Sequence, residues 1–326
     1  MTGAAGFIGG HLATRFLSQD IEVHLLDNFS RGVEDPFLKE IQNKSNARFF
    51  TIDLMQPSCF KDLGNDYDII IHLAAIIGVR HVMQRPYSVL HDNVSMLGKV
   101  IEFCHKQKKL KRLLFASTSE VTVGSLQYLD LKIPTPETEA LALTQLDAPR
   151  TSYMLSKIYG EAMCHHSGIP FTVFRPHNVY GPRMGMSHVV PELLQRTLNE
   201  SQNGKLEVAS PTHRRAFCYI DDAIEQISRM VTTDQALNQV LNLGNQEAEC
   251  SIEELANMVL KVVNRNDIQI KALPDTPGSP SRRCPDMTCT NKIINYKAQV
   301  DLYTGVEKTF DWYNEHVFTD GGKTAV

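Results

Sequence analysis

The chain has 326 residues, of which 42% are hydrophobic, so it is long enough for one large domain or two interleaved ones. Its formal net charge of −4 offers no reason to expect binding to nucleic acids or to anionic membrane surfaces. No window approaches the roughly 20 apolar residues of a membrane span, and no secretory signal pattern precedes the first glycines. We therefore expect no nucleic-acid partner and no membrane partner.

The chain opens with MTGAAGFIGGHL, in which Gly3, Gly6 and Gly9 recur every three residues. In a dinucleotide site, such glycines permit a tight turn, close approach of the pyrophosphate and close helix packing. The phosphates then bind the free N–H groups at the start of the helix, which here include those of Phe7 and Ile8. Taken alone, the spacing is a weak signal.

Only Met1 and Thr2 precede this turn, although the strand before such a turn normally lies at the centre of the sheet. Loss of a central buried strand should cost more than the roughly 5–15 kcal/mol of total stability of a typical domain. We therefore expect the first strand to be truncated in this sequence, so that a chain extended upstream is more stable, unless another segment fills the place.

The first half then alternates apolar runs with amphipathic stretches. Strands are expected at 22–27, 47–53, 68–75, 112–117 and 171–176, and helices at 9–19, 93–107 and 152–168. Nearly continuous apolar runs are typical of parallel strands covered on both faces. The alternation predicts an α/β fold with a doubly wound parallel sheet of the Rossmann type.

Acidic residues close the second and third of these runs. Asp27 lies about 20 residues beyond the glycine turn, where a carboxylate accepts hydrogen bonds from the adenosine ribose. Because that carboxylate repels a 2′-phosphate, it favours NAD over NADP, although Arg31 lies nearby. Asp53 is either an adenine-side contact or a helix cap.

After Pro176 the regular alternation of apolar runs and amphipathic stretches ends. We expect helices at 189–200 and 251–264, strands at 216–220 and 239–244, and a loop at 273–286 that is rich in proline and glycine. The expected division is an NAD-binding domain of residues 1–175 plus about 215–245, and a smaller substrate-binding region of 176–214 plus 246–318. Residues 319–326 are expected to form a flexible tail.

Tyr153 and Lys157 stand four residues apart, on one face of the expected helix. A free tyrosine is a poor base at neutral pH, but a neighbouring ammonium and an oxidised nicotinamide stabilise its phenolate and lower its pKa. The two residues therefore predict a base and its activating cation. The alternative is a pair of exposed helix residues.

The segment STSE follows another expected strand, at the sheet edge where α/β folds bind ligands. Its Thr118 hydroxyl is suited to hold the substrate oxygen from which Tyr153 removes a proton. The alternative is a polar turn that caps a helix.

These motifs, in this order and over nearly the whole chain, resemble the nucleotide-sugar epimerases, dehydratases and decarboxylases of the extended short-chain dehydrogenase/reductase family. The resemblance also rests on DNFSRG, DIIIHLAA, FRPHNVYGPRM, RRAFCYIDD, LNLGN and RRCPD, and on Asn93, expected to open a helix. It implies NAD as cofactor, a nucleotide-diphosphate sugar as substrate and a homodimer.

The resemblance also implies roles for individual residues. The catalytic set is Thr118, Ser119, Glu120, Tyr153 and Lys157. The cofactor-binding set is Gly3, Gly6, Phe7, Ile8, Gly9, Asp27, Asn28, Asp53, Leu54, Leu73, Ala74, Ala75, Asn93, Tyr153 and Lys157. The substrate-binding set is Thr118, Asn178, Val190, Arg215 and Arg283. His177 stands where an aromatic or small residue is more usual, which points to a modified substrate pocket.

The shared chemistry of these enzymes oxidises the sugar at C4 to a bound 4-keto intermediate, and the later steps distinguish them. A nucleotide-sugar 4-epimerase needs no further acid or base, and base rates within the family favour it here. A UDP-glucuronate decarboxylase uses a serine, a glutamate and an arginine around the carboxylate, which Ser119, Glu120 and Arg283 match. A 4,6-dehydratase is a further alternative, and a non-catalytic NAD- or RNA-binding module is a remote one.

The seven cysteines are odd in number, scattered and without a C-x-x-C pair, and the adjacent His165 and His166 lack partners at metal-ligand spacing. They favour reduced thiols in a cytoplasmic protein that holds no metal.

Overall fold

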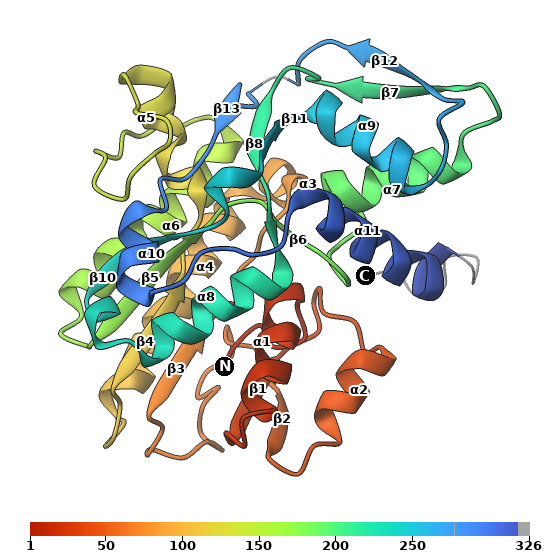
Figure 1. The fold of residues 1–326 in the computed structure, drawn as a ribbon. Helices are drawn as coiled ribbons and strands as arrows, with labels where there is room; N and C mark the ends of the chain where they lie inside the picture. Colours follow the sequence, from red (N-terminus) through yellow and green to blue (C-terminus); the bar gives the residue numbers. More distant parts are fainter. Residues whose placement is uncertain (277, 319–326) are drawn as a thin grey trace.

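The computed structural model describes residues 1–276 and 278–318, and the expected tail of 319–326 lies outside this range (Figure 1). The strands are β1 (Val23–Asp27), β2 (Ala47–Thr51), β3 (Ile69–His72), β4 (Arg112–Ala116), β5 (Phe171–Pro176), β6 (Val179–Tyr180), β7 (Lys205–Ala209), β8 (Arg214–Ala216), β9 (Cys218–Tyr219), β10 (Gln239–Leu243), β11 (Glu249–Ser251), β12 (Gln269–Leu273) and β13 (Arg282–Arg283). The α-helices are α1 (Phe7–Leu17), α2 (Pro36–Gln42), α3 (Val79–Gln84), α4 (Pro86–His105), α5 (Val123–Tyr128), α6 (Pro149–His166), α7 (Val189–Asn199), α8 (Ile220–Thr232), α9 (Ile252–Val262), α10 (Thr288–Ile294) and α11 (Leu302–Tyr313).

The main sheet is parallel, as expected. One part runs β10-β5-β4-β3 and the other pairs β1 with β2, and every pairing in both is parallel. Thr2 bridges Leu26 of β1 and His72 of β3, so it joins the two parts into one sheet. The expected Rossmann-type arrangement is confirmed.

The first residues of the chain hold the central place in this sheet. The N–H of Leu26 donates to the Met1 carbonyl at 2.9 Å, and the N–H of Thr2 donates to the Ile71 carbonyl at 2.9 Å. Hydrogen bonds from these residues therefore reach both neighbouring strands. Thr2 itself forms two isolated β-bridges, one to Leu26 and one to His72. Burial of the Met1 amino group lowers its pKa to about 5.

Alternating side chains divide the core between the two faces of the sheet. Ile70 and Leu113 pack with α4 and α6 on one face, whereas Ile71 and Leu114 pack with α1 and α8 on the other. Because both faces are covered, the strands are apolar at nearly every position, which made them recognisable in the sequence.

The second half builds smaller sheets beside the main one, with α7, α9, β7 and β12 grouped together (Figure 1). Two expectations are corrected here. The apolar run at 216–220 does not form one strand, because it is divided among β8, β9 and the start of α8. The expected loop at 273–286 contains β13, since Arg282 and Arg283 pair in parallel with Arg214 and Arg215 of β8.

Candidate active site

The glycine turn forms a cradle in which side chains do not fit. A Cβ on Gly3, whose φ is +70°, would lie 2.7 Å from the Ala74 nitrogen, and a Cβ on Gly9 would lie 2.2 Å from the Gly3 carbonyl oxygen. The turn therefore packs directly against the start of α1 and against the segment after β3. At Gly6 a Cβ would meet only the Gly3 oxygen, at 3.3 Å.

This cradle fits the pyrophosphate of a dinucleotide. Helix α1 begins at Phe7 directly after Gly6, and its first N–H groups have no partner within the helix. Both the exposed donors and the helix dipole favour a negatively charged group at this end. Gly3, Gly6, Phe7, Ile8 and Gly9 thus lie together as expected.

Asp27 fastens the end of β1 to the same turn. Its Oδ2 accepts a hydrogen bond from the Ala5 N–H at 2.9 Å, and its Oδ1 accepts one from the Phe29 N–H at 2.9 Å. Each oxygen keeps a second lone pair, which is available to ribose hydroxyls. The exposed Asn28 follows, and its Oδ1 accepts from the Ser30 N–H at 3.0 Å.

Asp53 and Leu54, both expected among the cofactor-binding residues, lie just after β2. Asp53 follows β2 and its Oδ1 accepts from the Met55 N–H at 2.9 Å, so it caps a turn. The Leu54 side chain is buried in the core between the sheet and α4.

Asn93 anchors the segment after β3, but it does not open a helix. Helix α4 begins at Pro86, whose fixed φ suits the first helical position, and Asn93 lies two turns further on. Its Oδ1 accepts from the Ile76 N–H at 2.7 Å, and its Nδ2 donates to the Ile76 carbonyl at 3.1 Å. This clamp holds Leu73, Ala74 and Ala75 beside the glycine turn.

Lys157 is 4% exposed, and its Nζ donates to the Ala116 carbonyl at 2.8 Å, at the end of β4. It lies 5.9 Å from the centre of the Tyr153 ring, so the two residues share one face of α6. Burial lowers the pKa of Lys157 to about 8.

The sequence predicted a lowered pKa for the Tyr153 phenol, and for the chain without its cofactor this prediction is wrong. Burial raises the pKa of Tyr153 above its ordinary value, and the negative charge of Glu120 acts in the same direction. A hydrogen bond with Thr118 and the positive charge of Arg31 oppose this effect but do not outweigh it.

The segment after β4 meets the distant strand β13. Arg283 Nη2 lies 2.8 Å from Glu120 Oε1, and its Nη1 donates to the Ser119 hydroxyl at 3.5 Å. Thr118 also caps the short helical turn that follows, since its hydroxyl accepts from the Glu120 N–H at 3.2 Å. The helix-cap interpretation of this segment is therefore confirmed, whereas its role at a ligand-binding edge stays a prediction.

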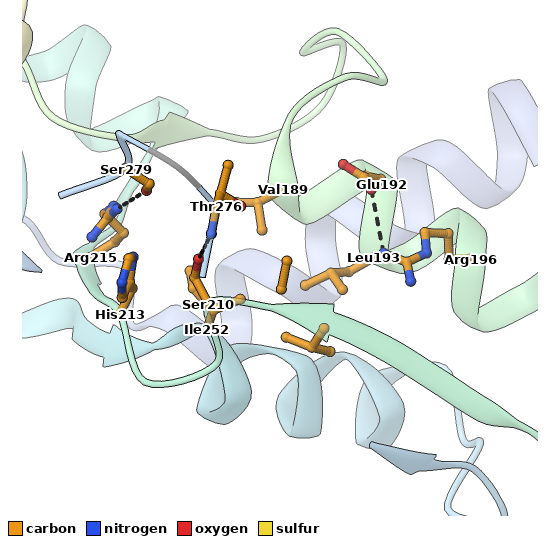
Figure 2. Close-up of a pocket in the computed structure, with 12 residues that line it drawn as sticks. Val189, Glu192, Leu193, Arg196, Ser210, His213, Arg215, Ile252, Thr276 and Ser279 are labelled. Carbon is orange, nitrogen blue, oxygen red and sulfur yellow. Dashed lines mark hydrogen bonds and ion pairs between the residues drawn. The ribbon is translucent and has the colours of Figure 1, made fainter. Parts of the chain in front are cut away.

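A pocket of about 290 Å³ opens beyond this cluster, between α7, β7 and the loop before β13 (Figure 2). Arg215 lines it and donates to the Ser279 hydroxyl at 3.0 Å. Burial and the positive charge of Arg283 lower the pKa of Arg215 to about 10. Arg215 of β8 pairs with Arg283 of β13, so the pocket lies beside the strand that contacts Glu120.

Two other expected substrate contacts lie near this pocket. Val190 is completely buried in the core, and its neighbours Val189 and Leu193 line the pocket instead. Asn178 has a left-handed backbone with φ +37°, and its Nδ2 donates to the Ala216 carbonyl at 3.1 Å.

Sequence reasoning missed a buried network beneath the active site. Glu161 accepts two hydrogen bonds from Arg175, at 2.9 and 2.7 Å, and one from the Ser117 hydroxyl at 2.5 Å. The sequence did contain one signal for this network, because Glu161 stands four residues after Lys157 and therefore on the same face of α6. Its negative charge favours the protonated form of Lys157.

The family model described as "NAD dependent epimerase/dehydratase family" matches residues 1–244. The chain belongs to this family. It is therefore an enzyme that uses NAD and acts on nucleotide sugars, as the resemblance implied. Within the described ranges 1–276 and 278–318, no helix is long and apolar enough to cross a membrane.

Several members of the family are similar over nearly their whole length. A UDP-N-acetyl-α-D-glucosaminuronate decarboxylase from Bacillus cytotoxicus is 27% identical, with 97% of each chain covered. UDP-glucuronic acid decarboxylase 6 from Arabidopsis thaliana is 29% identical over 94% of this chain and 85% of that relative. The solved UDP-glucuronic acid 4-epimerase from Bacillus cereus, in complex with UDP-glucuronic acid and NAD, is 25% identical with a TM-score of 0.77, covering 96% and 98% of the two chains.

Proposed function

We propose that this enzyme decarboxylates a UDP-linked hexuronate. The observation that carries the proposal is the contact of Arg283 with Glu120 and Ser119, next to Thr118 and the Tyr153 phenol. A guanidinium can hold a planar carboxylate through two parallel hydrogen bonds. In our proposal, Arg283 binds the carboxylate of the substrate and Tyr153 is the base that acts at C4, and their proximity supports this division of roles.

In the proposed reaction, Tyr153 accepts the proton of the C4 hydroxyl while Thr118 holds that oxygen and Lys157 keeps a positive charge nearby. NAD supplies the chemistry of accepting a hydride from C4 and returning it later. Arg283 orients the carboxylate of the resulting β-keto acid, whose C5–C6 bond breaks to release carbon dioxide. The electrons pass into the C4 carbonyl to give an enolate, and a proton from solvent, added to C5 in place of the lost carboxylate, restores the ketone.

The similar decarboxylases support this choice, which the sequence analysis held as the alternative to 4-epimerisation. Epimerisation remains the second candidate, because the UDP-glucuronic acid 4-epimerase shares the fold over nearly the whole chain. Both candidates act on an acidic sugar, for which Arg283 is suited.

Mass spectrometry separates these reactions. The enzyme with NAD is incubated with UDP-glucuronate, UDP-N-acetylglucosaminuronate and UDP-glucose in parallel. Loss of carbon dioxide from a uronate supports the proposal, and UDP-glucose should show no change in mass. A new isomer of unchanged mass means epimerisation, loss of water means dehydration, and no reaction with any sugar supports a binding role.

We further propose that the UDP portion occupies the pocket lined by Arg215, with Asn178 and Arg283 near its diphosphate. Two guanidinium groups supply the charge that a diphosphate needs. We also propose the expected division, with residues 1–175 plus about 215–245 binding NAD and 176–214 plus 246–318 binding the sugar nucleotide, so that Arg215 lies at the boundary between the two parts. Binding of UDP alone, weakened in Arg215→Met, tests the placement of UDP.

We also propose a homodimer through α4 and α6, which pack against each other and leave Tyr87 and Tyr159 76% and 53% exposed. A light-scattering mass of one chain would contradict this proposal. All seven cysteines are free thiols, which fits the proposed cytoplasmic location.

A further inference from the structure

Arg183 is a fully buried cation that contacts the carbonyl groups of the glycine turn proposed to bind the cofactor. Its guanidinium is 2% exposed and stacks on Phe37, with its carbon 4.9 Å from the ring centre. Its Nε donates at 2.5 Å to Asp35, which is itself 5% exposed and caps the N-terminus of α2. A buried ion pair of this kind needs further hydrogen bonds to offset its desolvation.

Those hydrogen bonds go to the turn itself. Arg183 Nη1 donates to the Gly6 carbonyl at 3.3 Å, and Nη2 donates to the Ala5 carbonyl at 3.2 Å. The same Nη2 reaches the Val33 carbonyl at 3.3 Å, in the loop that follows Asp27. One side chain thus joins the glycine turn, the loop beyond β1 and the start of α2.

The bond to Gly6, together with the helical hydrogen bond that the Gly10 N–H donates to the same carbonyl at 3.0 Å, sets the direction of a cofactor donor. In a trans peptide the carbonyl and the next N–H point in opposite directions. Because Arg183 holds the Gly6 oxygen on one side, the Phe7 N–H faces the other side, where the pyrophosphate fits.

Arg183 belongs to the substrate-binding half of the chain. It follows β6 and Asn178, and six residues later α7 begins, which lines the pocket proposed for the nucleotide. We propose that Arg183 is a positioning residue, which sets the glycine turn for NAD from the substrate-binding half of the molecule.

Arg183→Lys tests this proposal, because lysine keeps the charge but loses the planar fork. NAD and UDP affinities are measured separately by calorimetry on the full chain, with thermal melting as a check of folding. The NAD Kd should rise at least about tenfold, the cost of one charged hydrogen bond, while the UDP Kd stays within about twofold.

Arg265→Lys is the matched control. Arg265 pairs with Asp267 and holds the carbonyls of Thr197, Glu200 and Ser201, but it does not touch the turn. Both of its Kd values should stay near those of the parent.

If Arg183→Lys does not fold, Gly10→Ala gives a second route. A Cβ on Gly10 would lie 2.9 Å from Arg183 Nη1 and 2.9 Å from the Phe37 ring on which the guanidinium stacks, so it disturbs the position of the guanidinium without removing either charge. It should weaken NAD binding in the same way. An unchanged NAD Kd in a folded variant, or equal losses of NAD and UDP affinity together with a lower Tm, would overturn the proposal. Because no turnover is needed, these results are independent of whether the enzyme decarboxylates its substrate.

Discussion

Arg283 of β13 and Glu120 after β4 form an ion pair of 2.8 Å between segments that are far apart in the sequence. The pair is partly buried and lies beside Ser119 and Thr118. It brings the proposed carboxylate-binding group to the carboxyl end of the central sheet, where Tyr153 and Lys157 also lie.

Glu120→Gln should separate oxidation from decarboxylation. The variant keeps the size of the side chain but loses the charge that holds Arg283 in place, so carbon dioxide release should fall at least about tenfold, the cost of one charge-assisted hydrogen bond. Reduction of NAD by the uronate, followed by its fluorescence, should continue. Glu253→Gln, at an exposed position of α9, serves as the control. Equal rates of carbon dioxide release in both variants would count against a role for Glu120.

Tyr153→Phe should abolish turnover, by at least about 1,000-fold, because no other group takes the C4 proton. NAD should stay bound, since the hydroxyl contributes little area to the cleft. Tyr159→Phe, on the exposed face of the same helix, should retain full activity. Substantial turnover by the Tyr153 variant would show that the base has been assigned wrongly.

The alkaline limb of the pH profile should report Lys157. Its pKa of about 8 means that the ammonium loses its proton as the pH rises above this value. The cationic form is the active one in our scheme, so kcat/KM should decline above about pH 8. Lys157→Arg stays charged at any accessible pH, so its lower activity should show no such decline. A decline at the same pH in both proteins would assign it to another group.

Gly9→Ala should block NAD binding. The added Cβ would lie 2.2 Å from backbone at Gly3, which cannot yield as a side chain can, and overpacking of this kind costs about 1–3 kcal/mol. Gly98→Ala on α4 is the matched control, because its Cβ would meet only Met163 at 3.8 Å. The control should be neutral or about 1 kcal/mol more stable, as expected for alanine in a helix. NAD binding is measured by calorimetry. Equal affinities in the Gly9 variant and the control would contradict the claim that the glycine turn binds NAD.

Two buried histidines should make the protein sensitive to acid. Burial lowers the pKa of both His72 and His177 from 6.5 to about 3. Between these values the unfolded chain binds protons that the folded chain does not, so stability is lost as the pH falls below about 6.5. Each histidine contributes a slope of about 1.4 kcal/mol per pH unit.

Urea unfolding at a series of pH values measures that slope. His177→Phe should reduce the slope by about 1.4 kcal/mol per pH unit, the contribution of one histidine. His105→Gln, at an exposed position of α4, should leave the slope unchanged. An unaltered slope in the His177 variant would show that this side chain is already protonated in the folded protein.

The sequence could predict elements whose signal is local. The five apolar runs of the main sheet, the glycine turn and the Tyr153–Lys157 spacing each lie within a few consecutive residues, and all were found where expected. The prediction that Asn93 opens a helix was wrong, because a polar residue of this kind indicates a helix start although α4 already begins at Pro86. Arg283 was identified through the family resemblance, although its strand pairs with β8, which is distant in the sequence.

Contacts between distant charged residues could not be predicted. Arg183 and Asp35, like Arg175 and Glu161, are read from sequence as surface charges, because nothing local shows that each will be buried against its partner. Likewise, the choice between Val189 and Val190 as the pocket residue depends on how α7 is rotated against β7. Such features follow from tertiary packing and need the structure.

The most direct test of the proposed reaction uses UDP-glucuronate labelled with a carbon isotope at its carboxyl group, incubated with the enzyme and NAD. We predict that the label appears as carbon dioxide, in equal amount to a UDP-linked product that has lost it. A product that retains the label, either as an isomer of unchanged mass or as a dehydrated sugar, would contradict the decarboxylase assignment.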